Sequence, residues 1–228
     1  MKLSRWVGDA FQNLQLSSEG REFLQSRGLT ESQVSRFKTW SSPKEVCPNK
    51  RFRISFGSRW EDLQGFLVFP YYGAGGRKLL GFEARSVREK KFADVRLPCA
   101  RWNPVFYGMC QASHKIWDGS PLWVTEGIFD ALSVERVIPE DHAVLATLTA
   151  RFDRKQMTYV ERFVKGEVFL MYDNDSTGRE GSQVAIKNLK KRGVSCTEIS
   201  YRGGKDPNDI LLAEGVSGLK KVLRPYIF

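Results

Sequence analysis

The sequence contains no apolar run long enough to cross a membrane. Its longest apolar stretches, such as residues 65–70, fall far short of the ~20 residues that a transmembrane helix requires. The N-terminus, which begins Met1-Lys2-Leu3-Ser4, has no apolar segment of signal-peptide length. We therefore expect a soluble protein of the cytoplasm that has no membrane partner.

Cysteine and histidine are too sparse and too scattered for a structural zinc site. The four cysteines occur without any C-x-x-C pair. Such a site usually takes its ligands from two close pairs, and only Cys110 and His114 have that spacing. The sequence therefore predicts no zinc, and reduced thiols are typical of a cytoplasmic protein.

The chain also lacks internal repeats, low-complexity tracts and any single block of basic residues. Its 228 residues nevertheless include 36 Lys and Arg against 26 Asp and Glu, which gives a net charge of +10 and a pI near 9.5. This excess favours a polyanionic partner, nucleic acid before a membrane surface, although a basic surface can also serve solubility alone. Because the basic residues are dispersed, the fold has to gather them.

The first half of the chain predicts a mixed α and β subdomain. Ser17 and the box Thr30-x-x-Gln33 are typical N-caps of two short helices. From about residue 50 to 110, short aromatic and β-branched runs alternate with glycine. A strand–turn–strand unit is expected at residues 66–69, 71–76 and 78–82. The turn sequence at residues 118–121 is the candidate domain boundary.

Beyond that turn, buried apolar runs alternate with segments of helical spacing. Strands are expected at residues 122–125, 143–148, 168–172 and 197–201. Helices are expected at residues 128–137 and 153–163, and a third, opened by the capping box Thr177-x-x-Glu180, ends at Lys191. Two short helices close the chain. This alternation predicts an α/β fold, a largely parallel sheet with helices on both faces that follows the mixed α+β subdomain.

Acidic residues follow three of the four predicted strands. Glu126 follows the first strand, and Asp130 lies one helical turn later on the same side. Asp173 and Asp175 follow the third strand, and a spacing of two in an extended segment directs both carboxylates to one side. Asp206 lies in the loop after the fourth strand. In sheets of this kind, chemistry collects at the carboxyl ends of the strands.

Each of these acids also has a structural explanation, because Asp and Glu stabilise helix N-termini and Asp is common in turns. Three acidic clusters in a net-basic chain nevertheless favour a site. Converging carboxylates repel one another unless a cation holds them together. Hard oxygen ligands suit Mg²⁺ or Mn²⁺, and these ions serve phosphoryl and nucleotidyl transfer. A metal site is therefore the preferred interpretation.

Three segments resemble the motifs of the Toprim domain in order and spacing. They are Thr125-Glu-Gly-Ile-Phe-Asp130, Tyr172-Asp-Asn-Asp-Ser-Thr-Gly-Arg-Glu180 and Lys205-Asp-Pro-Asn208. That domain is shared by bacterial-type primases, type IA and type II topoisomerases and several nucleases. The resemblance implies a Toprim α/β domain in the second half of the chain.

The segments outside these motifs resemble the bacterial-type primase core. Residues 22–31 are similar to the first segment of that core. Four further segments resemble its basic N-terminal subdomain, namely residues 66–70, 81–85, 90–92 and 106–108. The resemblance thus spans about residues 18–210. Topoisomerases and Toprim nucleases are not expected to carry that subdomain.

The primase resemblance implies a role for each matching acid. Glu126 would lie nearest the reacting phosphate as a metal ligand or general base, with Asp130 as a further catalytic residue in support. Two or more Mg²⁺ or Mn²⁺ ions would be held by Glu126, Asp173, Asp175 and Asp206. Asp173 and Asp175 would also be catalytic residues.

Two further points follow from the resemblance. Asn208 stands where many cellular primases have Asp, and whether Asn208 or the adjacent Asp209 ligates metal stays open. The residues expected to contact nucleotide or template are Arg53, Arg85, Lys91, Arg101, Arg179 and Lys205. Arg and Lys suit a triphosphate or a template backbone, with plain surface charge as the alternative.

We expect three parts: a basic primase-core-like subdomain at residues 1–118, the Toprim catalytic domain at 119–207 and a short C-terminal helical segment at 208–228. The scattered cysteines predict no zinc ribbon, and the ~20 residues after Leu211 leave no room for the helicase-binding bundle of cellular primases. The chain therefore resembles a minimal phage-type core. The implied partners are single-stranded DNA, NTPs, the RNA–DNA hybrid product and a replicative helicase or separate template-recognition factor. The implied setting is a bacterial or phage-infected host cell.

The leading hypothesis is a DNA primase that makes short RNA primers from NTPs on single-stranded DNA by metal-dependent nucleotidyl transfer. The alternatives are a Toprim-family metal-dependent nuclease and a non-catalytic primase relative that binds nucleic acid or a replisome partner. A topoisomerase is least favoured, because the chain lacks room for a separate nucleophile domain.

Overall fold

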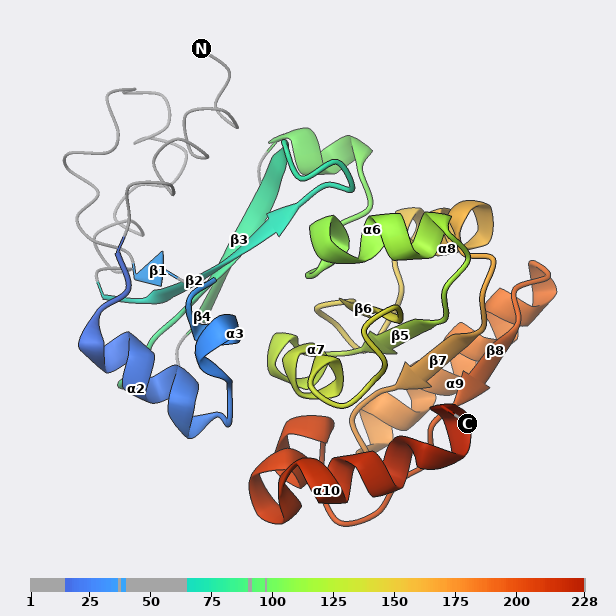
Figure 1. Ribbon diagram of the computed structural model, residues 1–228. Coiled ribbons are helices and arrows are strands. Elements are labelled where there is room, and N and C mark those ends of the chain that lie inside the picture. The colour runs from blue at the N-terminus through green and yellow to red at the C-terminus, as the bar shows by residue number, and fades with distance from the viewer. Residues whose placement is uncertain (1–14, 37, 40–64, 90–91, 97, 228) are drawn as a thin grey trace. The chain divides into compact units, whose positions relative to one another are not determined.

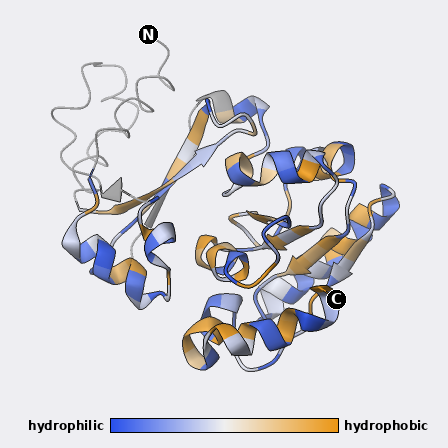
Figure 2. Cartoon of the chain, viewed as in Figure 1, coloured by the Kyte–Doolittle hydropathy of each residue, from blue (hydrophilic) through white to orange (hydrophobic). Residues whose placement is uncertain are grey.

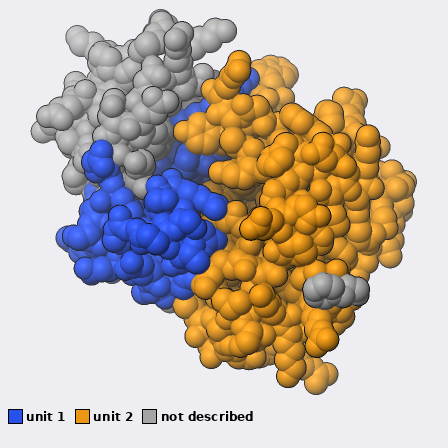
Figure 3. Space-filling view, in the orientation of Figure 1, with its two compact units in different colours: residues 1–71, 78–101 blue, residues 72–77, 102–228 orange. Residues whose placement is uncertain are grey.

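The computed structural model describes residues 15–36, 38–39, 65–89, 92–96 and 98–227 (Figure 1). They divide between two compact units, one within residues 1–71 and 78–101 and the other within residues 72–77 and 102–228 (Figure 3). None of the helices built from these residues is long and apolar enough to cross a bilayer. The division expected at residues 118 and 207 stays a prediction.

The first unit contains a four-stranded sheet in the order β1-β2-β3-β4. β1 pairs with β2, and β3 with β4, in antiparallel fashion. The strands are β1 (Lys38–Thr39), β2 (Leu67–Tyr72, whose last residue belongs to the second unit), β3 (Leu79–Arg85) and β4 (Phe92–Arg96). The strand–turn–strand prediction is thereby confirmed, because β2 and β3 flank the glycine-rich turn.

Two short helices precede this sheet, α2 (Ser18–Ser26) and α3 (Glu31–Val34), and the predicted caps are both present. The Ser17 side chain accepts a hydrogen bond from the Gly20 amide, and Thr30 and Gln33 form a capping box. A short 3₁₀ helix, η2 (Pro98–Trp102), follows β4. Side-chain capping therefore fixes both helix starts from local sequence alone.

The second unit is built on four parallel strands in the order β6-β5-β7-β8. The strands are β5 (Leu122–Thr125), β6 (Ala143–Ala146), β7 (Val168–Met171) and β8 (Cys196–Glu198). In the shared register, Leu122 of β5 lies opposite Ala143 on one side and Val168 on the other. The predicted α/β class with a parallel sheet is confirmed.

Helices cover both faces of the parallel sheet, as Figure 1 shows. One face packs against α6 (Met109–Trp117), α8 (Arg154–Phe163) and α9 (Ser176–Lys191). The other packs against α7 (Ile128–Glu135) and α10 (Pro207–Ile227). The core strands are hydrophobic on both faces, and the helices carry hydrophilic residues toward solvent (Figure 2).

Two features of the helices bear on the predictions. Gly215 interrupts α10 with a φ of 68°, so the segment consists of two helices, as expected. α6 was not predicted, because its sequence mixes polar and apolar residues without a strong capping signal, and its N-cap is Gly108 with a left-handed φ of 85°.

The strand order creates a switch point between β5 and β7. The chain leaves β5 through α7 toward β6, and it leaves β7 through α9 in the opposite direction toward β8. In open parallel sheets, the crevice at the carboxyl ends of two such strands is where ligands bind. The loops that follow β5 and β7 are therefore the place to look for chemistry.

Candidate active site

Glu126 and Asp173 occupy the two sides of the switch point. Glu126 directly follows β5, and Asp173 lies two residues beyond the end of β7. Both side chains are partly buried. Burial, reinforced by the charges of Asp173 and Asp175, raises the pKa of Glu126 to about 7. The acids after two separate strands therefore interact electrostatically, as the sequence predicted.

Asp130 lies in the first turn of α7 and is buried. Its Oδ1 accepts a hydrogen bond of 3.3 Å from the Asn208 amide at the start of α10. Burial, together with the charges of Asp206 and Asp173, raises the pKa of Asp130 well above its ordinary range. Asp130 thus links the first acidic loop to the third.

Asp175 caps α9, which corrects the expected capping box at Thr177 and Glu180. The helix begins at Ser176, and Asp175 Oδ1 accepts a 2.9 Å hydrogen bond from the Gly178 amide. That hydrogen bond is the main reason why the pKa of Asp175 is lowered. Thr177 therefore lies inside the first turn, two residues past the N-cap position.

Gly178 allows α9 to approach the Asp173 backbone closely. A Cβ atom at this position would lie 2.1 Å from the Asp173 carbonyl oxygen. Asp173 itself has a raised pKa, because burial and the nearby Asp206 outweigh the attraction of Lys205. The glycine thus determines where the second acidic loop can sit.

Lys205 lies between the two carboxylates of this loop. Its Nζ is 3.5 Å from Asp173 Oδ2 and 3.4 Å from Asp175 Oδ2. The charge of Asp173 is the largest cause of the raised pKa of Lys205. Asp206, the remaining predicted ligand, precedes α10, where its Oδ1 accepts a 2.7 Å hydrogen bond from the Asp209 amide. Asp175 and Asp206 therefore both use one oxygen to cap a helix.

Several supporting residues were not identified from the sequence. The Asn174 amide donates to the Lys205 carbonyl at 2.6 Å, which ties the second acidic loop to the third. The Tyr201 hydroxyl lies 2.7 Å from the Tyr172 carbonyl and 3.2 Å from that of Lys205. The asparagine between the two aspartates was a visible signal, whereas nothing in the local pattern marked Tyr201.

Leu148 adopts a left-handed backbone conformation next to Glu126. Its φ is 68°, and its amide donates a 2.9 Å hydrogen bond to the Glu126 carbonyl. A β-substituted residue in this region costs about 1–3 kcal/mol, so the surrounding structure has to impose it. The strained residue therefore donates the hydrogen bond that holds the backbone of Glu126, and no local sequence pattern indicated it.

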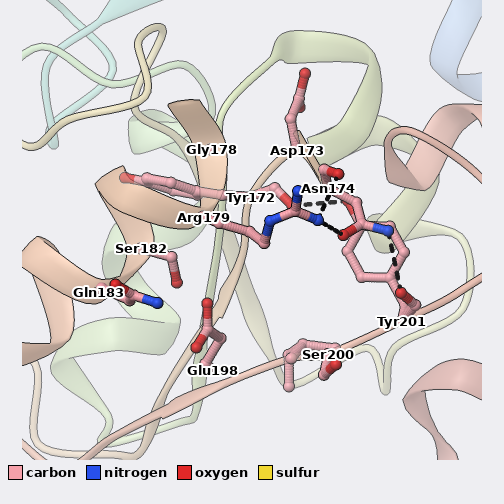
Figure 4. A pocket seen from close by; sticks show the side chains of 11 residues that line it. Tyr172, Asp173, Asn174, Gly178, Arg179, Ser182, Gln183, Glu198, Ser200 and Tyr201 are labelled. Atoms are coloured by element: carbon pink, nitrogen blue, oxygen red, sulfur yellow. Dashed lines mark hydrogen bonds between the residues drawn. The ribbon is translucent and has the colours of Figure 1, made fainter. Parts of the chain in front are cut away.

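A cavity of about 150 Å³ lies beside the Asp173 loop (Figure 4). Residues from the end of β7, the first turns of α9 and the segment after β8 line it. One Arg179 nitrogen donates to both the carbonyl and the side-chain oxygen of Asn174, at 3.0 and 2.8 Å. Arg179 thus stabilises the loop between the two aspartates and is itself exposed.

The other predicted basic residues are distributed as follows. Arg85 ends β3 and donates to Glu83 Oε1 at 2.7 and 2.9 Å, and Arg101 is exposed in η2. Both belong to the first unit, and the acidic residues belong to the second. Arg53 and Lys91 lie outside the described residues. Contact of these side chains with nucleotide or template stays a prediction.

Asn208 and Asp209, the two candidates for a further metal ligand, have different surroundings. Asn208 is buried, and its Nδ2 donates a 3.0 Å hydrogen bond to Ser133 Oγ on α7. Asp209 is exposed, and its Oδ2 accepts a 3.3 Å hydrogen bond from the Lys205 amide. Asn208 therefore joins α10 to α7.

Because Asn208 is buried and Asp209 is exposed, we expect their substitution to lower the stability of the protein by different amounts. Asn208→Ala is expected to lower the free energy of unfolding by about 1–3 kcal/mol, because a buried hydrogen bond is lost and its Ser133 partner is left behind. Asp209→Asn, an exposed change that keeps an acceptor, is expected to cost about 0.5 kcal/mol or less. Urea denaturation of both variants checks this, and equal stabilities would contradict the role given to Asn208.

Comparison with known proteins agrees with this architecture. A family model described as Toprim-like matches residues 123–211, a segment that contains the five predicted acids. The DNA primase of Thermotoga maritima is 24% identical, over 93% of this chain and 40% of its own length. That of Aquifex aeolicus is 27% identical, over 93% of this chain and 46% of its own. The chain therefore spans less than half the length of these relatives.

A solved structure shares the fold over almost the whole chain. It is described as the DnaG primase catalytic domain bound to single-stranded DNA, and the TM-score is 0.79 at 18% identity. The alignment covers 98% of this chain and 78% of that one. Residues 123–211 thus match a Toprim-like family, and the chain is similar to DNA primases in sequence and to the DnaG catalytic domain in fold.

Proposed function

We propose that this chain is the catalytic core of a DNA primase, which joins NTPs into short RNA primers on a single-stranded DNA template. The observation that carries the proposal is the meeting of acidic loops at the β5–β7 switch point, with a cationic side chain already seated between Asp173 and Asp175. The primase relatives support the choice of reaction among those that Toprim domains serve.

The donor set fits a hard divalent cation. Within the described part of the chain, no three His, Cys, Asp or Glu side chains are gathered closely enough to hold a metal ion as they stand. Asp173 and Asp175 nevertheless converge on one positive charge, and their own charges add to the effect of burial in raising the pKa of Glu126. Carboxylate oxygens are what Mg²⁺ and Mn²⁺ prefer.

In this proposal the ions would be held by Asp173, Asp175, Asp206 and Glu126. Bound there, they would supply charge stabilisation for an attacking oxygen and for a departing pyrophosphate. In the alternative role, with no ion on its carboxylate, Glu126 is suited to accept a proton from a primer 3′-hydroxyl, because a general base works best with a pKa near the operating pH. Asp130 would position the loops through its hydrogen bond from Asn208.

The template and the triphosphates would meet the basic residues of the chain. The net charge of +10 favours such a polyanionic partner. Arg85, Arg101 and Arg179, with Arg53 and Lys91, are our candidates for these contacts. A replicative helicase or a separate template-recognition factor is the proposed protein partner, in the cytoplasm of a bacterium or a phage-infected cell.

Primer synthesis in vitro tests the proposal. The protein is incubated with single-stranded DNA, the four NTPs and Mg²⁺ or Mn²⁺, and labelled products are separated on a gel. Short RNA products that disappear with EDTA are expected. Loss of the DNA without NTPs would instead indicate a nuclease. Salt-dependent DNA binding that is unchanged in Asp173→Asn and Asp175→Asn, without any product, would indicate a non-catalytic binding protein.

A further inference from the structure

The Lys205 ammonium occupies a position that a metal ion would need. Its Nζ lies 3.5 Å from Asp173 Oδ2 and 3.4 Å from Asp175 Oδ2, so one positive charge bridges both carboxylates. These oxygens belong to the pair that the proposed function assigns to metal. An ammonium and a divalent cation repel each other, and they cannot both lie between the same two oxygens.

The backbone of Lys205 is fixed, whereas its side chain is exposed. The Lys205 carbonyl accepts a 2.6 Å hydrogen bond from the Asn174 amide, and the Lys205 amide donates to Asp209 Oδ2 at 3.3 Å. The side chain retains 59% of its accessible surface, compared with 17% for that of Asp173. The ammonium can therefore swing into solvent while the loop that carries it stays in place.

The carboxylates need a counter-charge whether or not metal is present. Asp173 is close enough to Asp206, and Glu126 close enough to both Asp173 and Asp175, for their charges to interact. Without a cation the ionised carboxylates of this cluster repel one another. Lys205 supplies the cation from within the chain, directly before the Asp206 ligand position.

We propose that Lys205 is a built-in placeholder: its ammonium holds the Asp173–Asp175 pair together in the metal-free protein and is displaced when a divalent cation binds. This inference rests on the proposed function, because it assumes that the pair ligates metal. It makes Lys205 a positioning residue that weakens metal affinity, in addition to any contact with nucleotide. Metal binding would then release a positive charge at the site.

Mn²⁺ binding to the Lys205→Met variant tests the displacement. Methionine keeps most of the length of the side chain and removes the ammonium. A partly exposed ion pair contributes a factor of about 2 to 5 to an equilibrium constant. Losing two such pairs is therefore expected to tighten Mn²⁺ binding about tenfold. Isothermal titration without nucleotide measures this directly and does not depend on activity.

Arg202→Gln is the matched control, because Arg202 is exposed on the same loop and carries the same charge. Its Mn²⁺ affinity is expected to change less than twofold, since it removes positive charge without releasing the carboxylate pair. Equal tightening in both variants would overturn the placeholder and leave a general charge effect. The placeholder would also be overturned if wild type binds Mn²⁺ and Lys205→Met binds it no more tightly.

Thermal unfolding with and without metal gives a second, independent readout. In EDTA, Lys205→Met is expected to melt below wild type, because the carboxylates lose their counter-charge. In saturating Mn²⁺ the two are expected to melt together, since the ammonium is displaced from the carboxylates in wild type and is absent from the variant. An equal deficit in the two conditions would indicate a purely structural lysine. If none of the proteins binds Mn²⁺, the metal site of the proposed function fails together with the displacement.

Discussion

Replacing Glu126 with glutamine is expected to abolish primer synthesis and, at the same time, to stabilise the metal-free protein above pH 7. The activity falls because glutamine can neither accept a proton nor offer an anionic ligand; the loss of a general base costs about 10²- to 10⁴-fold. The stability rises because the fold holds Glu126 in a site where its ionised form is disfavoured. Opposite changes in activity and stability are typical of a functional carboxylate.

The pH dependence of this stabilisation follows from the pKa of Glu126. In the unfolded chain the carboxyl ionises near its ordinary pKa of 4.5, and in the folded protein it ionises at about 7. Below the first value both states are protonated and the variant gains nothing. Between the two values wild type loses stability as the pH rises, and above the second the loss is complete.

The gain of Glu126→Gln is therefore expected to appear as the pH passes 4.5 and to level off above 7. Its size is about 1 kcal/mol, after discounting for solvent screening at a half-buried side chain. Urea denaturation in EDTA at several pH values measures it. Glu140→Gln, an exposed acid-to-amide change before β6, should alter neither stability nor activity. A variant of Glu126 that stays active would exclude it from the chemistry.

The acidic strand ends were predictable because strand boundaries follow from short apolar runs between turn residues. β5 occupies the expected residues 122–125, and β7 ends one residue before the expected limit. Once the strands are parallel, their carboxyl ends must lie at one edge, so Glu126 and Asp173 come together. The sheet topology alone was therefore enough to predict that these two acids lie close together.

Capping at α9 could not be decided from the sequence. Asp175 and Thr177 are both good N-cap residues, and Glu180 completes a capping box only for Thr177. The structure selects Asp175 because its carboxylate reaches the Gly178 amide. Which of two possible N-cap residues is used therefore depends on the path of the loop that connects β7 to the helix.

Contacts between residues far apart in the sequence could not be predicted either. Lys205 was expected to contact nucleotide or template, and its ion pairs with Asp173 and Asp175 depend on how the third loop folds over the second. The same applies to Asn208, which is buried because α10 begins at Pro207 and packs against α7. Neither local propensity nor hydrophobic periodicity contains this information.

Replacing Gly178 with alanine is expected to damage both the fold and the activity, although Gly→Ala usually stabilises a helix. Within a helix the ordinary change gains about 0.5–1 kcal/mol. At Gly178 the new Cβ would lie 2.1 Å from the Asp173 carbonyl oxygen, 2.8 Å from its carbon and 3.0 Å from the Asp173 Cβ. Two of these three atoms are backbone, so no rotamer change can relieve the overlap.

Either α9 or the Asp173 loop must therefore move. We expect the free energy of unfolding to fall by about 1–3 kcal/mol, the usual range for overpacking. We expect primer synthesis to fall about 100-fold or more, because a shift of about 1 Å in a positioned group has effects of that size. Urea denaturation and the gel assay measure the two losses on the same preparation.

Gly75→Ala is the matched control for this change. Nothing lies within 4 Å of a Cβ at Gly75, and its backbone is not left-handed, so stability and activity should both stay near wild type. If Gly178→Ala instead gained the usual stability and kept its activity, the Asp173 loop would have to be freer than the contact allows. The sign of the effect thus distinguishes a glycine that only occupies a helix position from one that determines where the Asp173 carboxylate lies.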